Sequence, residues 1–136
     1  MQHLHFNHWA ILVSALIQWI IGALWYSPML FAKPWMAMIF VRKDSVKKNS
    51  MIMGMIASFI GSVVTSLMLA HVAIWSGAST YPAGMLIGFI LWLGFIAAPL
   101  WASYIYEGRP VKLYLINTGY WLVCLLVTGG LLAVWR

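Results

Sequence analysis

The segment that decides the fold runs from residue 22 to residue 35 and reads Gly22-Ala-Leu-Trp-Tyr-Ser-Pro-Met-Leu-Phe-Ala-Lys-Pro-Trp35. It ends a long apolar run, contains two prolines and gathers aromatic side chains. Proline disfavours the helical conformation of the residue before it, and Trp and Tyr concentrate where a membrane meets water. The segment therefore predicts the end of a membrane-spanning helix and a turn at the membrane surface.

The composition of the whole chain agrees with a membrane environment. Of its 136 residues, 64% are hydrophobic and 7% are charged, whereas a soluble domain carries about 25% charged residues. About 20 apolar residues cross a bilayer as a helix, so the length allows four spans. We expect an all-α membrane protein, a four-transmembrane-helix bundle that forms a single domain over residues 1–136. The expected spans are residues 9–29, 51–75, 81–106 and 113–135.

A short interfacial segment follows the first span. Residues 31–41 are too few to cross a bilayer, and Pro34 suits the first turn of a helix. We expect the segment to lie in the membrane interface with its apolar side chains buried, namely Trp35, Met36, Ile39 and Phe40. Residues 42–50 form a hydrophilic run, for which a solvated loop is the usual structure.

Two polar residues are placed to cap helices. Asn7 precedes the first apolar run, and Thr80 precedes Pro82 at the start of the third. Side-chain oxygens of Asn and Thr accept hydrogen bonds from the first free N–H groups of a helix, and proline suits the first helical turn. The sequence therefore predicts helix starts directly after Asn7 and Thr80.

The positive charge lies in the loops on one side of the predicted bundle. The net charge is +6, from eight Lys and Arg residues against two acids. Seven of the basic residues fall in loops 30–50 and 107–112, namely Lys33, Arg42, Lys43, Lys47, Lys48, Arg109 and Lys112. Basic loops stay in the cytoplasm and attract anionic lipid headgroups. We therefore expect both loops to be cytoplasmic, both termini to lie outside, and no nucleic acid to be bound.

Several polar or ionisable side chains lie inside the predicted spans. Gln18 needs a hydrogen-bond partner in hydrocarbon, so it faces protein or water, and both helix packing and ligand contact are open to it. His71 lies near a span end, where a functional role and a headgroup hydrogen bond are equally compatible with its position. The intramembrane candidates are Gln18, His71, Trp92, Asn117 and Tyr120.

Rows of small residues indicate helix-packing faces. The helix-packing candidates are Gly54, Ser58, Ser62 and Ser66 on the second span and Gly84 and Gly88 on the third. Small residues spaced four apart let helices approach closely in a membrane. We expect a central helix seam on the second span and close packing at the glycine pair. The spacing leaves open whether these contacts form within one chain or between copies.

The N-terminal histidines are weak candidates for a metal site. They are His3, His5 and His8. Imidazole binds zinc, copper or nickel, but no carboxylate or thiol lies nearby in the sequence. A polar cap at the membrane surface is the other interpretation, and we expect neither metal nor cofactor. Cys124 is the single cysteine, and we expect it to be a small buried side chain.

Four stretches of the chain carry a family pattern. They are Gly22-Ala-Leu-Trp-Tyr-Ser-Pro28 with Phe31 and Trp35, Trp92-Leu-Gly-Phe95, Glu107-Gly-Arg-Pro-Val-Lys-Leu113, and Ile116-Asn117 with Gly119-Tyr120. Their order and their spread over nearly the whole chain resemble the family of small bacterial membrane proteins known as domain of unknown function 1761 (DUF1761). The resemblance implies a four-span protein of the bacterial inner membrane, and it implies no reaction. Ala32 stands where the family pattern has glycine.

The resemblance also indicates a cluster at the cytoplasmic face. Its members are Trp25, Tyr26, Ser27, Pro28, Phe31, Trp35, Glu107, Arg109 and Lys112. The first loop follows the first span and the second loop precedes the fourth, so both lie at one membrane level and can form a shared cluster. The alternative is that these residues only maintain the fold, with Glu107 neutralising its loop.

The residue types narrow the class of function. Asp44 and Glu107 are the only carboxylates, and no catalytic pair, phosphate loop or metal-ligand spacing is visible, so we expect no enzyme. We expect a structural or accessory membrane protein that interacts with lipids, with a second copy of itself or with another membrane protein. The alternative is a small oligomeric transporter or channel for a small or amphipathic molecule, although no acid lies deep in a span.

Overall fold

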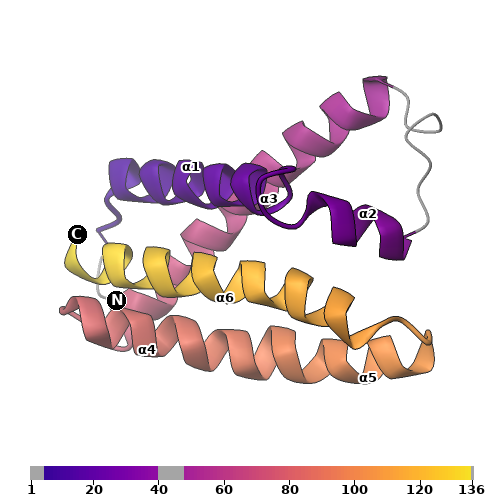
Figure 1. The fold of residues 1–136 in the computed structure, drawn as a ribbon. Helices are drawn as coiled ribbons and strands as arrows, with labels where there is room; N and C mark the ends of the chain where they lie inside the picture. The colour runs from indigo at the N-terminus through magenta and orange to yellow at the C-terminus, as the bar shows by residue number, and fades with distance from the viewer. Residues whose placement is uncertain (1–4, 40–47, 136) are drawn as a thin grey trace.

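The described part of the chain, residues 5–39 and 48–135 of this computed structural model, is built from helices and contains no strand (Figure 1). The helices are α1 (His8–Trp25), α2 (Ala32–Ile39), α3 (Lys48–Trp75), α4 (Tyr81–Trp92), the π-helix η2 (Leu93–Ala97), α5 (Ala98–Tyr106) and α6 (Val111–Val134). Because α4, η2 and α5 follow one another without a break, they form one long helix. The predicted all-α fold is confirmed.

Four helices are long and apolar enough to cross a membrane. They are His8–Trp25, Asn49–Trp75, Tyr81–Tyr106 and Val111–Val134. Large apolar side chains are exposed along all four of them, and a continuous exposed apolar surface of this kind is typical of contact with lipid. The chain is therefore a multi-pass membrane protein.

The first span ends earlier than the sequence predicted. α1 ends at Trp25, whereas the predicted boundary was residue 29. Ser27 Oγ donates to the Leu24 carbonyl over 2.6 Å, and the Phe31 N–H donates to the Trp25 carbonyl over 3.1 Å. These hydrogen bonds close a turn that brings Phe31 back to the end of α1. The helix α2 then begins at the next residue, Ala32.

Both predicted helix caps are confirmed. Asn7 Oδ1 accepts hydrogen bonds from the N–H groups of Trp9 and Ala10, over 3.1 and 3.2 Å. Thr80 Oγ1 accepts one from the N–H of Ala83 over 3.3 Å. Each cap satisfies N–H groups that have no partner inside the helix. The caps set the points at which α1 and α4 begin.

α6 is the central helix of the bundle. It packs against α1, α3 and α4, and 44% of its span is buried, against 17–28% for the other three. Its closest approach is to α4, because a Cβ atom at Gly84 would overlap the Gly129 carbonyl and one at Gly88 would overlap the Leu125 carbonyl. The predicted glycine pair thus lies at a contact inside one chain.

α3 packs along only part of its length. In Figure 1 it crosses the other helices obliquely, and its first turns diverge from α1. Every residue from 49 to 58 is exposed, whereas Ser62 and Ser66 are buried in the bundle. The row of small residues is therefore a seam only at Ser62 and Ser66. Its other members, Gly54 and Ser58, lie in the exposed diverging half, where Ser58 Oγ accepts a hydrogen bond from Trp19 of α1 over 3.2 Å but the predicted continuous helix contact is not formed.

The two ends of the bundle carry different elements. α1 begins and α6 ends at one end, while α2 and the turn between α5 and α6 lie at the other, which we name the α2 end (Figure 1). The two loops that were predicted to share a membrane level both lie at the α2 end. Several predicted members of the first loop, Phe40, Arg42, Lys43 and Lys47, lie outside the described residues.

Candidate functional site

Gln18 forms the centre of a polar core between α1, α3 and α6. Its side chain is fully buried. The Nε2 atom donates to Ser66 Oγ over 3.2 Å and to Thr128 Oγ1 over 3.1 Å. Thr128 donates its own proton to the Cys124 carbonyl over 2.7 Å, so its oxygen is free to accept from the amide. One amide therefore joins three helices, as interhelical hydrogen bonds do in membranes.

Two atoms of this polar core have no hydrogen-bond partner within the described residues. They are Gln18 Oε1 and Ser14 Oγ. Both residues belong to α1, one helical turn apart, and both are 0% exposed. A buried acceptor without a donor costs about 1–3 kcal/mol. The core therefore has unused hydrogen-bonding capacity at the centre of the bundle.

Tyr120 links the polar core to the side of the bundle. Its hydroxyl donates to the Gln18 carbonyl over 3.2 Å. A Cβ atom at Gly22 would lie 3.1 Å from that hydroxyl, so the absence of a side chain at Gly22 lets Tyr120 reach α1. Cys124 is fully buried beside the same carbonyl, with its Sγ 4.0 Å away. The prediction of a small buried cysteine is confirmed.

The turn after α1 is anchored on α6 by Trp25. Its Nε1 donates to the Ile116 carbonyl over 2.9 Å, and its ring lies 3.3 Å from where a Cβ atom at Gly119 would be. Phe31 packs on the Trp25 ring with a centroid separation of 4.8 Å. Pro28 is exposed at the tip of the turn. The Gly-x-x-Trp-Tyr-Ser-Pro stretch therefore holds the end of α1 against α6.

A chain of hydrogen bonds runs from this turn to α5. Tyr26 donates to Asn117 Oδ1 over 2.8 Å, and Asn117 Nδ2 donates to the Tyr104 hydroxyl over 2.7 Å. The rings of Trp35 and Tyr120 lie edge-on to Tyr26, with centroid separations of 5.3 and 5.7 Å. Tyr104 is not among the residues predicted from the sequence, because an aromatic residue near a span end is typical of any membrane interface.

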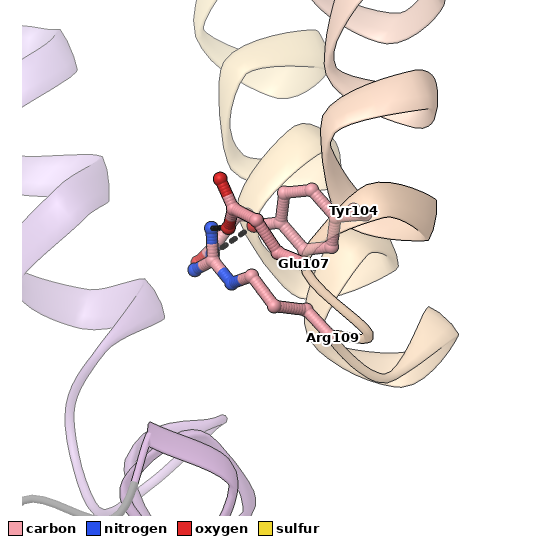
Figure 2. A network of polar contacts seen from close by, with 4 residues as sticks. Tyr104, Glu107 and Arg109 are labelled. Atoms are coloured by element: carbon pink, nitrogen blue, oxygen red, sulfur yellow. Dashed lines mark hydrogen bonds and ion pairs between the residues drawn. The ribbon is translucent and has the colours of Figure 1, made fainter.

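Figure 2 shows Glu107 and Arg109 beside the ring of Tyr104. The guanidinium carbon of Arg109 lies 4.2 Å from the ring centre, and its NH1 atom lies 3.4 Å from Glu107 Oε2. Gly108 between them has a φ of 65°, a conformation that favours glycine. Lys112 is exposed and has no ion pair within the described residues. Glu107 and Arg109 therefore contact each other and Tyr104, and within the described residues the turn after α1 reaches Tyr104 through Asn117.

A groove opens on the side of the bundle between α1, α2, α3 and α6. Its volume is about 1320 Å³. It exists because the first half of α3 diverges from α1. Its walls include Trp19, Trp35, Met55, Gly61 and Trp121. Neither Trp19 nor Trp121 was singled out from the sequence, since tryptophan is frequent in this chain and its spacing carries no groove signal.

The structure does not gather the five intramembrane candidates in one site. His71 lies near the C-terminal end of α3, whereas the α3 residues that line the groove lie between Met51 and Gly61. Its ring centroid is 4.3 Å from that of Phe6. Trp92 lies between α4 and α6 and donates to a carbonyl of α6 over 2.8 Å. Within the described residues, the one hydrogen bond that joins two of the five runs from Tyr120 to Gln18. Apart from this pair, the five residues serve separate contacts.

Two of the three N-terminal histidines, His5 and His8, lie in the described part of the chain. His5 and His8 are exposed. Among the residues that the structure describes, no group of three or more His, Cys, Asp or Glu side chains could hold a metal ion. His3 lies outside these residues.

Comparison with known proteins bears on the family of this chain. The family described as "Protein of unknown function (DUF1761)" matches residues 9–133. This range includes the polar core, the turn after α1 and the residues around Arg109. No curated protein and no solved structure matches the chain. Because the family match covers nearly the whole length, the chain belongs to the DUF1761 family of proteins of unknown function.

Proposed function

We propose that this protein is a non-enzymatic lipid-binding protein of the bacterial inner membrane and that the groove is its lipid site. The observation that carries the proposal is the groove itself, with its volume of about 1320 Å³. Pockets for drug-sized molecules measure about 300–1,000 Å³. The groove is therefore large enough for the hydrocarbon chain of a lipid, and it opens sideways, where lipid surrounds the bundle.

The lining of the groove suits a flexible apolar chain. Three methionines present adaptable thioether side chains to it, namely Met36, Met51 and Met55. Three of the aromatic residues in the lining already have partners for their polar atoms: Trp19 donates to Ser58 Oγ, Tyr26 to Asn117 and Tyr120 to Gln18. A hydrocarbon chain in the groove would therefore bury apolar surface without leaving these groups unpaired.

The proposal places the α2 end at the cytoplasmic side. Lys33, Arg109 and Lys112 are exposed at this end, and basic loops are retained in the cytoplasm. The groove would then receive lipid from the cytoplasmic leaflet, and both termini would lie on the outer side.

Filling the groove tests the proposal. Gly61 lines the groove, and a Cβ atom there would meet no other atom within 4 Å, so Gly61→Leu starts a side chain in open space at the groove. Gly94 is equally open but lies outside the groove lining, and Gly94→Leu is the matched control. Lipid retained from nanodiscs is counted by native mass spectrometry. We expect a several-fold loss for Gly61→Leu alone, and equal retention by all three proteins would exclude the site.

A transporter for an amphipathic molecule is the second candidate. It is supported by the unpartnered Oε1 of Gln18, which is buried behind Tyr120, a groove residue whose hydroxyl donates to the Gln18 main-chain carbonyl. A polar group in the groove would reach this acceptor after displacement of the Tyr120 side chain. Proteoliposomes would take up a fluorescent amphipathic amine, and Gln18→Met would abolish the uptake. Uptake no faster than in protein-free liposomes would remove this candidate.

A further inference from the structure

We propose that Arg109 binds the phosphate of an anionic phospholipid whose chains occupy the groove. The inference rests on the proposed lipid site and names the class of lipid that the site prefers. It is carried by the placement of an apolar groove and a basic rim at the same end of the bundle.

The charge at the α2 end favours an anionic headgroup. Lys33, Arg109 and Lys112 are exposed there, and Glu107 is the one acid among the described residues. Lys33 lies one helical turn before Met36, which lines the groove. Basic side chains beside a membrane-embedded apolar surface attract anionic lipids. The occupant that matches both features is a phospholipid with net negative charge.

Continuous contacts connect Arg109 to the groove. Its guanidinium lies over the Tyr104 ring, with 4.2 Å from its carbon to the ring centre. The Tyr104 hydroxyl accepts from Asn117 over 2.7 Å, and Asn117 accepts from Tyr26 over 2.8 Å. Tyr26 is part of the groove lining. A headgroup on a lipid in the groove would therefore lie at the same membrane level as Arg109.

Arg109 has hydrogen-bonding capacity to spare. The ring of Tyr104 supports one face of its guanidinium, which leaves the N–H edges open. One nitrogen contacts Glu107 over 3.4 Å, and the two side chains are 37% and 57% exposed. Such an exposed pair is weak. A phosphate accepts two parallel N–H bonds from a guanidinium, so it would displace Glu107 from Arg109.

Lys112 offers a matched comparison for Arg109. It carries the same charge and lies three residues further along the chain. It is exposed and forms no ion pair with the described residues. An ammonium group is a single point charge and lacks the fork geometry of a guanidinium. If lipid were attracted only by the general charge of this end, both residues would contribute equally. If Arg109 binds the phosphate directly, its loss is the more severe.

Lipid preference is the quantity to measure. Nanodiscs are made with equal amounts of phosphatidylglycerol and phosphatidylcholine that carry the same acyl chains, and the lipid retained by the protein is identified by native mass spectrometry. We expect the lipid retained by the wild-type protein to be enriched in phosphatidylglycerol. We expect Arg109→Gln to lower this enrichment about tenfold. Lys112→Gln should keep most of the enrichment. Glu107→Gln should increase it, since the competing carboxylate is gone.

The two proposals fail in different ways. The same enrichment in wild type and Arg109→Gln, or equal losses in Arg109→Gln and Lys112→Gln, would overturn the role of Arg109 while the total lipid retained still reports the groove. Unchanged total lipid in Gly61→Leu would instead overturn the lipid site itself. Arg109→Lys keeps the charge, and we expect it to restore only part of the preference because the paired hydrogen bonds are lost.

Discussion

At the scale of single residues, Gln18 shows how one amide organises three helices. Both protons of its Nε2 atom are used, by Ser66 on α3 and by Thr128 on α6. Its Oε1 atom is buried without a partner. The favourable and unfavourable contributions of this side chain therefore oppose each other, so its net effect on stability is smaller than its central position suggests.

Replacement of Gln18 tests this balance. Gln18→Met removes two interhelical hydrogen bonds, each of about 0.6 kcal/mol in a membrane protein, and also removes the unpartnered oxygen. We expect a loss of about 1 kcal/mol or less in the free energy of unfolding, measured by denaturation in detergent. Gln18→Glu should cost more, since burial of a carboxyl group is expensive. A loss for Gln18→Met as large as that for Gln18→Glu would contradict this account.

At the scale of helices, the glycines of α3 and the glycines of α4 have opposite roles. Gly84 and Gly88 let α4 approach the backbone of α6, whereas Gly54 and Gly61 on α3 have open space around their Cα atoms. The spacing along the chain does not distinguish them. The difference arises because α4 runs alongside α6, while the first half of α3 leaves the bundle.

The two kinds of glycine should respond in opposite ways to alanine. At Gly88 the added methyl would overlap the Leu125 carbonyl, and we expect a loss of about 1–3 kcal/mol in the free energy of unfolding. At Gly54 it meets nothing within 4 Å, and we expect a gain of about 0.5–1 kcal/mol from the lower backbone entropy of the unfolded chain. Thermal unfolding in detergent compares the variants, and destabilisation by both would argue against an open α3.

At the scale of the whole molecule, the two ends of the bundle differ in charge. α2 and the turn at residues 107–110 share one end of the bundle, and residues 76–80 lie at the other. Among the residues whose side chains are described, Lys33, Arg109 and Lys112 lie at the α2 end and are exposed. By the positive-inside rule this distribution supports the proposed orientation, in which the α2 end faces the cytoplasm.

Cysteine labelling in cells tests the orientation. Cys124 is fully buried, so single reporters can be placed in a Cys124→Ala background at Ser79 and Val111, both of which are exposed. A membrane-impermeant maleimide should label Ser79→Cys on the outer side of intact cells with a permeable outer envelope. It should label Val111→Cys only after lysis. Labelling of Val111→Cys in intact cells would reverse the orientation.

Most of the fold could be predicted from the sequence, because a membrane helix is a local structure. Its length and apolar composition mark each span, and the caps at Asn7 and Thr80 mark two of the starts. The burial of Gln18 against protein also followed from its amide, which hydrocarbon cannot satisfy. The end of α1 was the exception, since the turn at Ser27 depends on specific hydrogen bonds.

The sequence by itself determined the spans, their apolar surfaces and the loops that carry charge, since each follows from side chains transferred between water and lipid. The tertiary structure alone decided that the first half of α3 opens a groove, that the glycine pair packs within one chain, and that Tyr104 joins Arg109 to Tyr26. These features depend on the angles at which helices cross. A repeat of small residues permits close approach at many angles, and only the packing of all four helices together selects one.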